Sequence, residues 1–384
     1  MVKIKDVLNK LGPSIGLSFK NWMKLFLFEG KNNFKYYFPR ILLINLFKTF
    51  FIPFEIYESL RFRKILKKTY ISKPPIFIIG HWRTGTTHLQ NLLCQDPQFG
   101  FINMIQATFP KLFLSNMISH VVLKNYIPET RPMDNMKLGI FSPTEEEMSM
   151  GNLILYSFYN GWYLPRKMNE HYDHFIRFKG LSKKIINLWK EKYLYLLKKI
   201  TYYNKGKQLI LKSPANTSRI KTLLELFPTS KFIHIYRNPY TVFVSTKNFY
   251  KKAIQIFMLQ KLSDEEIENY IIDIYKKMMT DFFRDKQLIP ERNLVEVKFE
   301  NLEEDPISEL KNIYSRLNIK GFSKIKPIFL EYLNSIQGYR KNEYKFTKKI
   351  IQKIEKSWSF TIDKWDYEIP GENQIPELKS ILNF

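Results

Sequence analysis

The sequence predicts an α/β protein with a P-loop-like parallel sheet of about four to five strands flanked by helices, a long helical insertion and an N-terminal helical region. First, the apolar run at 74–79 enters a glycine-bounded loop, GHWRTGTT at 80–87, which continues as a helical pattern. Second, residues 207–249 alternate strand, helix, strand and helix. Third, the roughly 120 residues between these segments have helical character and exceed a simple βαβ crossover. Their aromatic residues indicate a substrate pocket or ordinary core.

The first 70 residues are strongly basic and rich in aromatic side chains. They hold 14 basic and 4 acidic residues, a net charge of +10. Their most apolar run, 41–54, contains Lys48 and Pro53 and is too short and interrupted for a membrane-spanning helix. We therefore predict a helical region at 1–70 and one domain at 71–384, joined near residues 67–75. The amphipathic helices would either pack on the domain or lie on an anionic bilayer.

The predicted strands of the domain end in basic residues. Lys212 follows the apolar run 209–211, and Arg237 follows the apolar run 232–236. Ligands of open parallel sheets bind outside the carboxyl ends of the strands, so we expect the loop at 80–87, Lys212 and Arg237 to converge. The alternation at 293–299 predicts a fourth parallel strand, and the remainder is predicted to be helical.

Arg237 is followed by a helix start. Asn238 is expected to cap the helix, and Pro239 suits its first position. Ser245 lies on this helix, eight residues beyond Arg237.

The loop has the form of a phosphate cradle, with an unusual placement of its charge. Gly80 and Gly85 bracket four residues, as in the phosphate-binding loop of nucleotide hydrolases. The usual Lys after the second Gly is replaced by Thr86, and the loop's cation is Arg83. No acidic residue ends a strand where it would hold Mg²⁺, which disfavours a kinase-like reaction.

Together, the RTGTT loop and the pattern R-N-P-x5-S beginning at Arg237 resemble the sulfotransferase family that uses 3′-phosphoadenosine 5′-phosphosulfate (PAPS). The resemblance runs from about Lys73 to the C-terminal region, through KSPANTSRI, ELFPTSKFIHIYRNP and VKFENLEEDP. It is closest to the branch whose loop begins GHWR. In the cytosolic branch, with the loop PKSGTTW, a Lys stands where this chain has Arg83.

The resemblance implies a donor site and a leaving-group role. The loop would cradle the 5′-phosphosulfate, Arg237 and Ser245 would bind the 3′-phosphate, and Arg83 with Lys212 would stabilise the leaving oxygen without a metal. A basic C-terminal segment closes over the donor in the cytosolic branch; here Arg340 and Lys341 would do so or remain solvated charges. The donor-binding set is thus Gly80, Arg83, Thr84, Gly85, Thr86, Thr87, Arg237, Ser245, Arg340 and Lys341.

The acidic run SPTEEEM at 142–148 contains the candidate general base, and it resembles an acidic segment of the GHWR branch. Ser142 as N-cap with Glu145 at the third helical position would form a capping box. Helical spacing then places Glu147 on the apolar face, where desolvation raises the pKa of a carboxylate and makes it a better base. We expect Glu147 first and Glu146 second to act as base.

The composition narrows the remaining choices. A net charge of +25 suits an anionic donor but exceeds what one nucleotide needs. Cys94 is the single cysteine, so no intrachain disulfide forms, and a cytoplasmic location, peripheral at the membrane or free of it, is expected. No Cys and His cluster suggests a metal site.

Two alternative functions compete with the sulfotransferase hypothesis. One is a P-loop kinase-like enzyme, and the other is a non-catalytic basic protein that binds membrane or nucleic acid. The second gives no reason for the spacing of the loop and of Arg237 and Ser245. The acceptor is expected to be a small molecule, lipid or glycan bearing a hydroxyl or amine, and no nucleic-acid partner is expected.

Overall fold

The computed structural model describes residues 21, 23–24, 34–115, 130–131, 133–134, 136–255, 257–338 and 344–371. The chain divides into two compact units. Unit 1 comprises Met1–Lys73, Gly100–Leu211 and Lys252–Ser263; unit 2 comprises Pro74–Phe99, Lys212–Lys251 and Asp264–Phe384. The division into a helical region at 1–70 and one domain at 71–384 stays a prediction.

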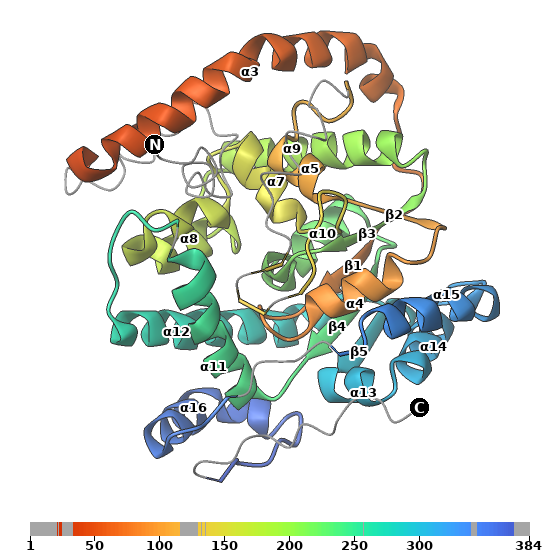
Figure 1. Ribbon diagram of the computed structural model, residues 1–384. Coiled ribbons are helices and arrows are strands. Elements are labelled where there is room, and N and C mark those ends of the chain that lie inside the picture. The colour runs from red at the N-terminus through yellow and green to blue at the C-terminus, as the bar shows by residue number, and fades with distance from the viewer. Residues whose placement is uncertain are drawn as a thin grey trace. The chain divides into compact units, whose positions relative to one another are not determined.

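A five-stranded sheet with the order β2-β3-β1-β4-β5 confirms the predicted α/β class. Its strands are β1 (Ile76–Ile79), β2 (Phe99–Phe101), β3 (Gln208–Lys212), β4 (Lys231–Tyr236) and β5 (Leu294–Lys298). Within unit 2, β4 pairs in parallel with β1 and with β5, which lie on either side of it (Figure 1). The three-residue strand β2 was not predicted, because it is too short to show a periodic pattern.

Unit 2 holds the helices that follow the strands β1, β3, β4 and β5. They are α4 (Thr86–Leu93), η3 (Pro214–Ser218), α10 (Ile220–Leu226), α11 (Pro239–Phe249), α12 (Asp264–Asp285), η5 (Lys286–Leu288), η6 (Glu291–Asn293), α13 (Phe299–Glu304), α14 (Pro306–Arg316), α15 (Phe322–Ser335) and α16 (Lys348–Ile362). The predicted cap of α11 is confirmed: Asn238 Oδ1 accepts hydrogen bonds from the amides of Tyr240 and Thr241, at 3.0 and 3.2 Å. The π-helical turn η4 (Tyr250–Ile254) follows directly.

Apart from the residues of β2 and β3 that it holds, unit 1 has mainly helical secondary structure in the part that the structure describes. Its helices are α3 (Phe34–Lys68), α5 (Met104–Thr108), α7 (Glu146–Leu153), η1 (Phe158–Trp162), η2 (Pro165–Lys167), α8 (Met168–Phe175) and α9 (Lys183–Tyr203). The predicted capping box at Ser142 is wrong, because α7 begins at Glu146 with Glu145 as N-cap. Ser142 Oγ instead accepts a hydrogen bond from the Gly139 amide at 2.8 Å. The Ser142 hydroxyl therefore closes a short turn at 139–142 and does not cap a helix.

The C-terminal half of α3 packs alongside α9 (Figure 1). Its inward face buries Glu58, Phe62 and Leu66, which are four residues apart and share one side of the helix. The Glu58 carboxylate receives the Lys199 ammonium at 2.6 Å and the Ser115 amide at 2.8 Å. Burial lowers the pKa of Lys199, and the Glu58 charge opposes that shift. Among the described helices, none is long and apolar enough to cross a bilayer.

Replacing Glu58 by alanine is expected to lower the free energy of unfolding by about 3–5 kcal/mol, because the Lys199 ammonium would remain buried without its counter-charge. Chemical denaturation of the full-length chain measures the loss. Glu55→Ala is the matched control: its ion pair with Lys111 is longer, at 3.4 Å, and partly exposed, so about 0–1 kcal/mol is expected. Equal losses in the two variants would contradict a structural role for the buried pair.

Candidate active site

The loop between β1 and α4 has a backbone that requires glycine at both ends. Gly80 has a φ of 145°, and a Cβ there would lie 2.3 Å from the carbonyl oxygen of Ile235. Gly85, with a φ of 96°, is the N-cap of α4, and a Cβ there would lie 2.1 Å from the Phe299 ring. Both values lie where side chains are strained, and the space is filled. The loop therefore keeps a bare backbone at the start of a helix, as an anion cradle needs.

Hydroxyl groups fix the loop to the rest of unit 2. The Gly80 amide donates to Thr217 Oγ1 at 2.8 Å, and the Thr217 hydroxyl donates back to the Gly80 carbonyl at 3.1 Å. Inside the loop, Thr84 Oγ1 donates to the His81 carbonyl at 2.8 Å. Burial lowers the pKa of His81 to about 4, and its Nδ1 faces the Trp82 carbonyl at 2.8 Å. His81 is therefore a neutral side chain that supports the loop at pH 7.

Arg83 joins the loop to α11. Its backbone has a φ of 72°, and its Nε donates to Ser245 Oγ at 3.0 Å. The Tyr344 hydroxyl donates to the same Ser245 oxygen at 3.1 Å. The residue predicted at the bridging oxygen and the residue predicted at the 3′-phosphate are therefore hydrogen-bonded neighbours.

Lys212 ends β3 beside the start of α4. Its Nζ lies 3.4 Å from Thr87 Oγ1, and the residue is 2% exposed. A buried lysine at a strand end differs from the solvated surface charge that such a position often carries. The Lys212 ammonium therefore lies at the start of α4, where the phosphate loop ends, and it would contact an anion bound there.

Arg237 follows β4 and lies over an aromatic ring. Its guanidinium carbon is 4.2 Å from the centre of the Phe299 ring, and one of its nitrogens is 3.5 Å from the Arg83 carbonyl. Burial lowers the pKa of Arg237, and the negative charges of Glu303 and Glu300 oppose this shift. A cation that is poorly hydrated and fixed against a ring is prepared to bind a phosphate.

The structure brings most of the predicted donor residues together within unit 2. Contacts join the loop at 80–87 to Lys212, Arg237 and Ser245. The predicted contributors Arg340 and Lys341 lie outside the described residues.

The two candidate base residues belong to unit 1, and both are 1% exposed. Glu147 Oε1 accepts hydrogen bonds from the Ser157 hydroxyl at 2.7 Å and the Phe158 amide at 3.2 Å. The Tyr193 hydroxyl donates to Glu146 Oε1 at 3.3 Å. The inward position predicted for Glu147 is found, and Glu146 is equally buried. Both lie in the first turn of α7, where the helix dipole stabilises a carboxylate.

Sequence reasoning missed four residues that support the site. Thr217 holds Gly80, Phe299 packs against both Gly85 and Arg237, and Tyr344 reaches Ser245. The fourth, Glu300, accepts from the amide of Asn238 at 3.0 Å. Each stands in a stretch quoted for the family resemblance or beside the predicted closing segment. The sequence signal for these four residues is therefore their position in or beside those stretches.

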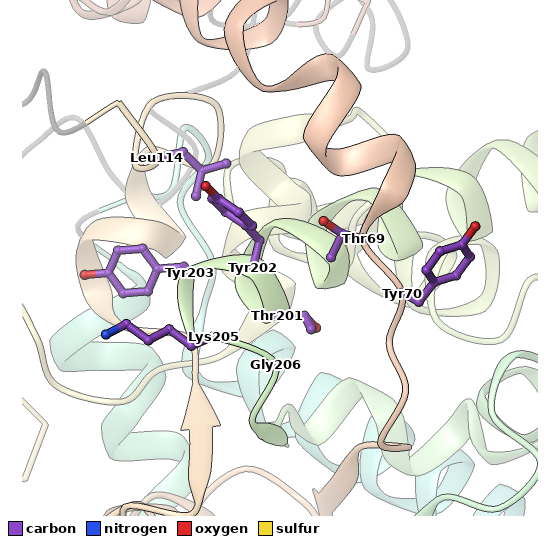
Figure 2. Close-up of a pocket in the computed structure, with 8 residues that line it drawn as sticks. All are labelled: Thr69, Tyr70, Leu114, Thr201, Tyr202, Tyr203, Lys205 and Gly206. Carbon is purple, nitrogen blue, oxygen red and sulfur yellow. The ribbon is translucent and has the colours of Figure 1, made fainter.

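The described part of the chain contains no group of three or more His, Cys, Asp or Glu side chains able to hold a metal ion. A pocket of 510 Å³ lies within unit 1, and Figure 2 shows its three tyrosines and Lys205. Its lining residues are Thr69, Tyr70, Leu114, Thr201, Tyr202, Tyr203, Lys205 and Gly206. None of them is a predicted site residue, so the donor site is assigned from the loop and its contacts.

Comparison with known proteins gives concordant matches. A model described as the sulfotransferase family matches residues 74–324. Omega-hydroxy-beta-dihydromenaquinone-9 sulfotransferase Stf3 of Mycobacterium bovis is 28% identical over 357 residues, which are 92% of this chain and 91% of that protein. The Mycobacterium tuberculosis protein of the same name matches with the same values.

Two solved structures share the fold. Sulfotransferase STF9 from Mycobacterium avium has a TM-score of 0.64 at 14% identity, covering 83% of each chain. Sulfotransferase STF1 from Mycobacterium tuberculosis H37Rv has a TM-score of 0.58 at 16% identity, covering 76% of this chain and 81% of that one.

Proposed function

The chain belongs to the sulfotransferase family and is a sulfuryl-transfer enzyme, and from that premise we propose that its donor is PAPS, held by the loop at 80–87, Lys212, Arg237 and Ser245. Family membership removes the kinase-like and non-catalytic alternatives. The absence of Lys after Gly85, which first argued against a kinase, agrees with this assignment.

The observation that carries the donor proposal is the hydrogen bond between Arg83 and Ser245. It links the phosphate loop to the helix that follows Arg237, so a molecule with phosphates at both ends of a ribose would meet cations at each. Arg237 and Ser245 would hold the 3′-phosphate. The loop amides and Lys212 would hold the 5′-phosphosulfate, with Arg340 and Lys341 proposed to close over the donor.

Charge placement gives the mechanism. PAPS supplies a sulfuryl group attached to a good leaving oxygen, and in-line displacement through a loose transition state leaves negative charge on that oxygen. Arg83 and Lys212 would stabilise this charge, and the start of α4 would orient the phosphate. Arg83 gives its Nε–H to Ser245, and the four Nη–H donors of the same guanidinium would reach the leaving oxygen.

The acceptor is proposed to be a lipid that carries a hydroxyl group. The support is the relative named for a menaquinone-derived lipid, which aligns with 92% of this chain. A hydroxyl must lose its proton as it attacks, so a base is required. We place this role on Glu147 first and Glu146 second, because both are buried carboxylates in the acidic segment identified from the sequence.

The donor proposal predicts strong discrimination between nucleotides. In calorimetry on the full-length chain, 3′-phosphoadenosine 5′-phosphate (PAP) should bind more tightly than AMP by about 1.5–3 kcal/mol. This is the value of a charge-assisted contact to the 3′-phosphate. Arg237→Gln should remove most of this difference. Arg292→Gln, at an exposed arginine of η6, is the matched control and should leave this difference unchanged. Equal PAP and AMP affinities in the unmodified chain would refute the 3′-phosphate assignment.

A further inference from the structure

The outward face of α3 is apolar over most of its length. Leu42, Leu46 and Phe50, spaced four residues apart, are 46%, 60% and 67% exposed, and Ile56 and Leu60 continue at 55% and 67%. Leu60 is two residues from both Glu58 and Phe62 on the buried face, which places it about 200° around the helix from each. The face directed away from unit 1 therefore carries the large apolar side chains that a water-exposed helix face normally lacks.

The charges that α3 exposes are positive. The last two turns carry Arg61, Arg63, Lys64, Lys67 and Lys68, all exposed. The helix has two acidic residues, Glu55 and Glu58, and both are engaged by lysines of unit 1. The surface thus combines an apolar row with a basic end, and its carboxylates are already neutralised.

We infer that the outward face of α3 is a docking surface for an anionic lipid bilayer, with the row from Leu42 to Leu60 inserted and the basic end bound to lipid phosphates. An interfacial helix needs these two features, an apolar face for the acyl boundary and cations for the headgroups. The buried contacts of Glu58, Phe62 and Leu66 keep the opposite face on unit 1. The helix therefore lies along the membrane surface with the protein above it.

A second copy of the chain fits this surface less well. Each copy would bring exposed cations against those of the other, and the whole chain carries a net charge of +25. An anionic bilayer supplies both the apolar phase and the opposite charge.

Vesicle flotation of the full-length chain tests the inference. Vesicles of phosphatidylcholine with 30 mol% phosphatidylglycerol should carry the protein at low salt, and pure phosphatidylcholine should carry much less. Arg63→Gln with Lys64→Gln should weaken binding roughly 25-fold, since each cation near an anionic surface contributes about fivefold. Leu46→Glu with Leu60→Glu should weaken it by more than about tenfold. Both leucines are well exposed, so the thermal midpoint should stay unchanged.

The matched control places the same two charges elsewhere. Leu288→Glu with Leu330→Glu changes exposed leucines of unit 2, 53% and 42% exposed, and should bind vesicles as the unmodified chain does. Three results would overturn the inference: no flotation of the unmodified chain, equal flotation of the two leucine variants, or self-association that the Leu46 and Leu60 changes abolish without any vesicle binding. The last would assign the face to a second copy.

Discussion

Replacing Arg83 by alanine is expected to lower turnover by roughly 10²–10³-fold while weakening PAP binding far less. The reason is that charge on the bridging oxygen grows only as the bond to sulfur breaks, and Arg83 is the cation of the loop. Single-turnover kinetics with PAPS and calorimetry with PAP separate the two effects. A variant in which both quantities fall equally would assign Arg83 to ground-state binding.

Two further variants sharpen this test. Arg83→Lys, which restores the residue of the cytosolic branch, should recover part of the rate because it keeps the charge but loses the planar donor geometry. Lys221→Ala, an exposed cation of α10, is the control for net charge and should leave turnover unchanged. If Arg83→Ala retained full turnover, Lys212 or the loop amides would have to stabilise the leaving oxygen.

The Glu147→Gln variant is expected to lower turnover by roughly a hundredfold or more while PAP affinity is retained, because a neutral amide cannot accept the proton of the acceptor hydroxyl. The substitution keeps the side-chain shape and an oxygen that still accepts from the Ser157 hydroxyl. Turnover per folded molecule, measured with saturating donor and a lipid alcohol, is the deciding quantity. Glu146→Gln, made in the same turn, tests the second candidate.

Ser157→Ala separates chemistry from structure at this position. It removes a hydrogen bond to Glu147 without removing the carboxylate. A structural role for Glu147 predicts that both variants lose stability and that both keep turnover per folded molecule. The catalytic role predicts a large loss of turnover in Glu147→Gln alone.

Features that depend on adjacent residues could be predicted from the sequence alone. The apolar runs of β1, β3, β4 and β5, the glycines at 80 and 85 and the cap at Asn238 are local patterns, and the structure has all of them. Arg237 and Ser245 are also close in the chain: Arg237 directly precedes Asn238, the N-cap of α11, and Ser245 lies within that helix. Strand direction then placed Lys212 and Arg237 at one end of the sheet.

The distant residues that complete those patterns are known from the folded structure and could not be predicted from the sequence. Thr217 meets Gly80 across 137 residues, and the Phe299 ring fills the space that makes glycine necessary at 85. The sequence left open whether the N-terminal helices pack or face a membrane; in the structure, α3 buries Glu58 against Lys199 and exposes Leu46 and Leu60. Contacts of this kind form when folding brings separate elements together. A single hydroxyl, ring or carboxylate has no periodic pattern in the sequence from which its contact partner could be predicted.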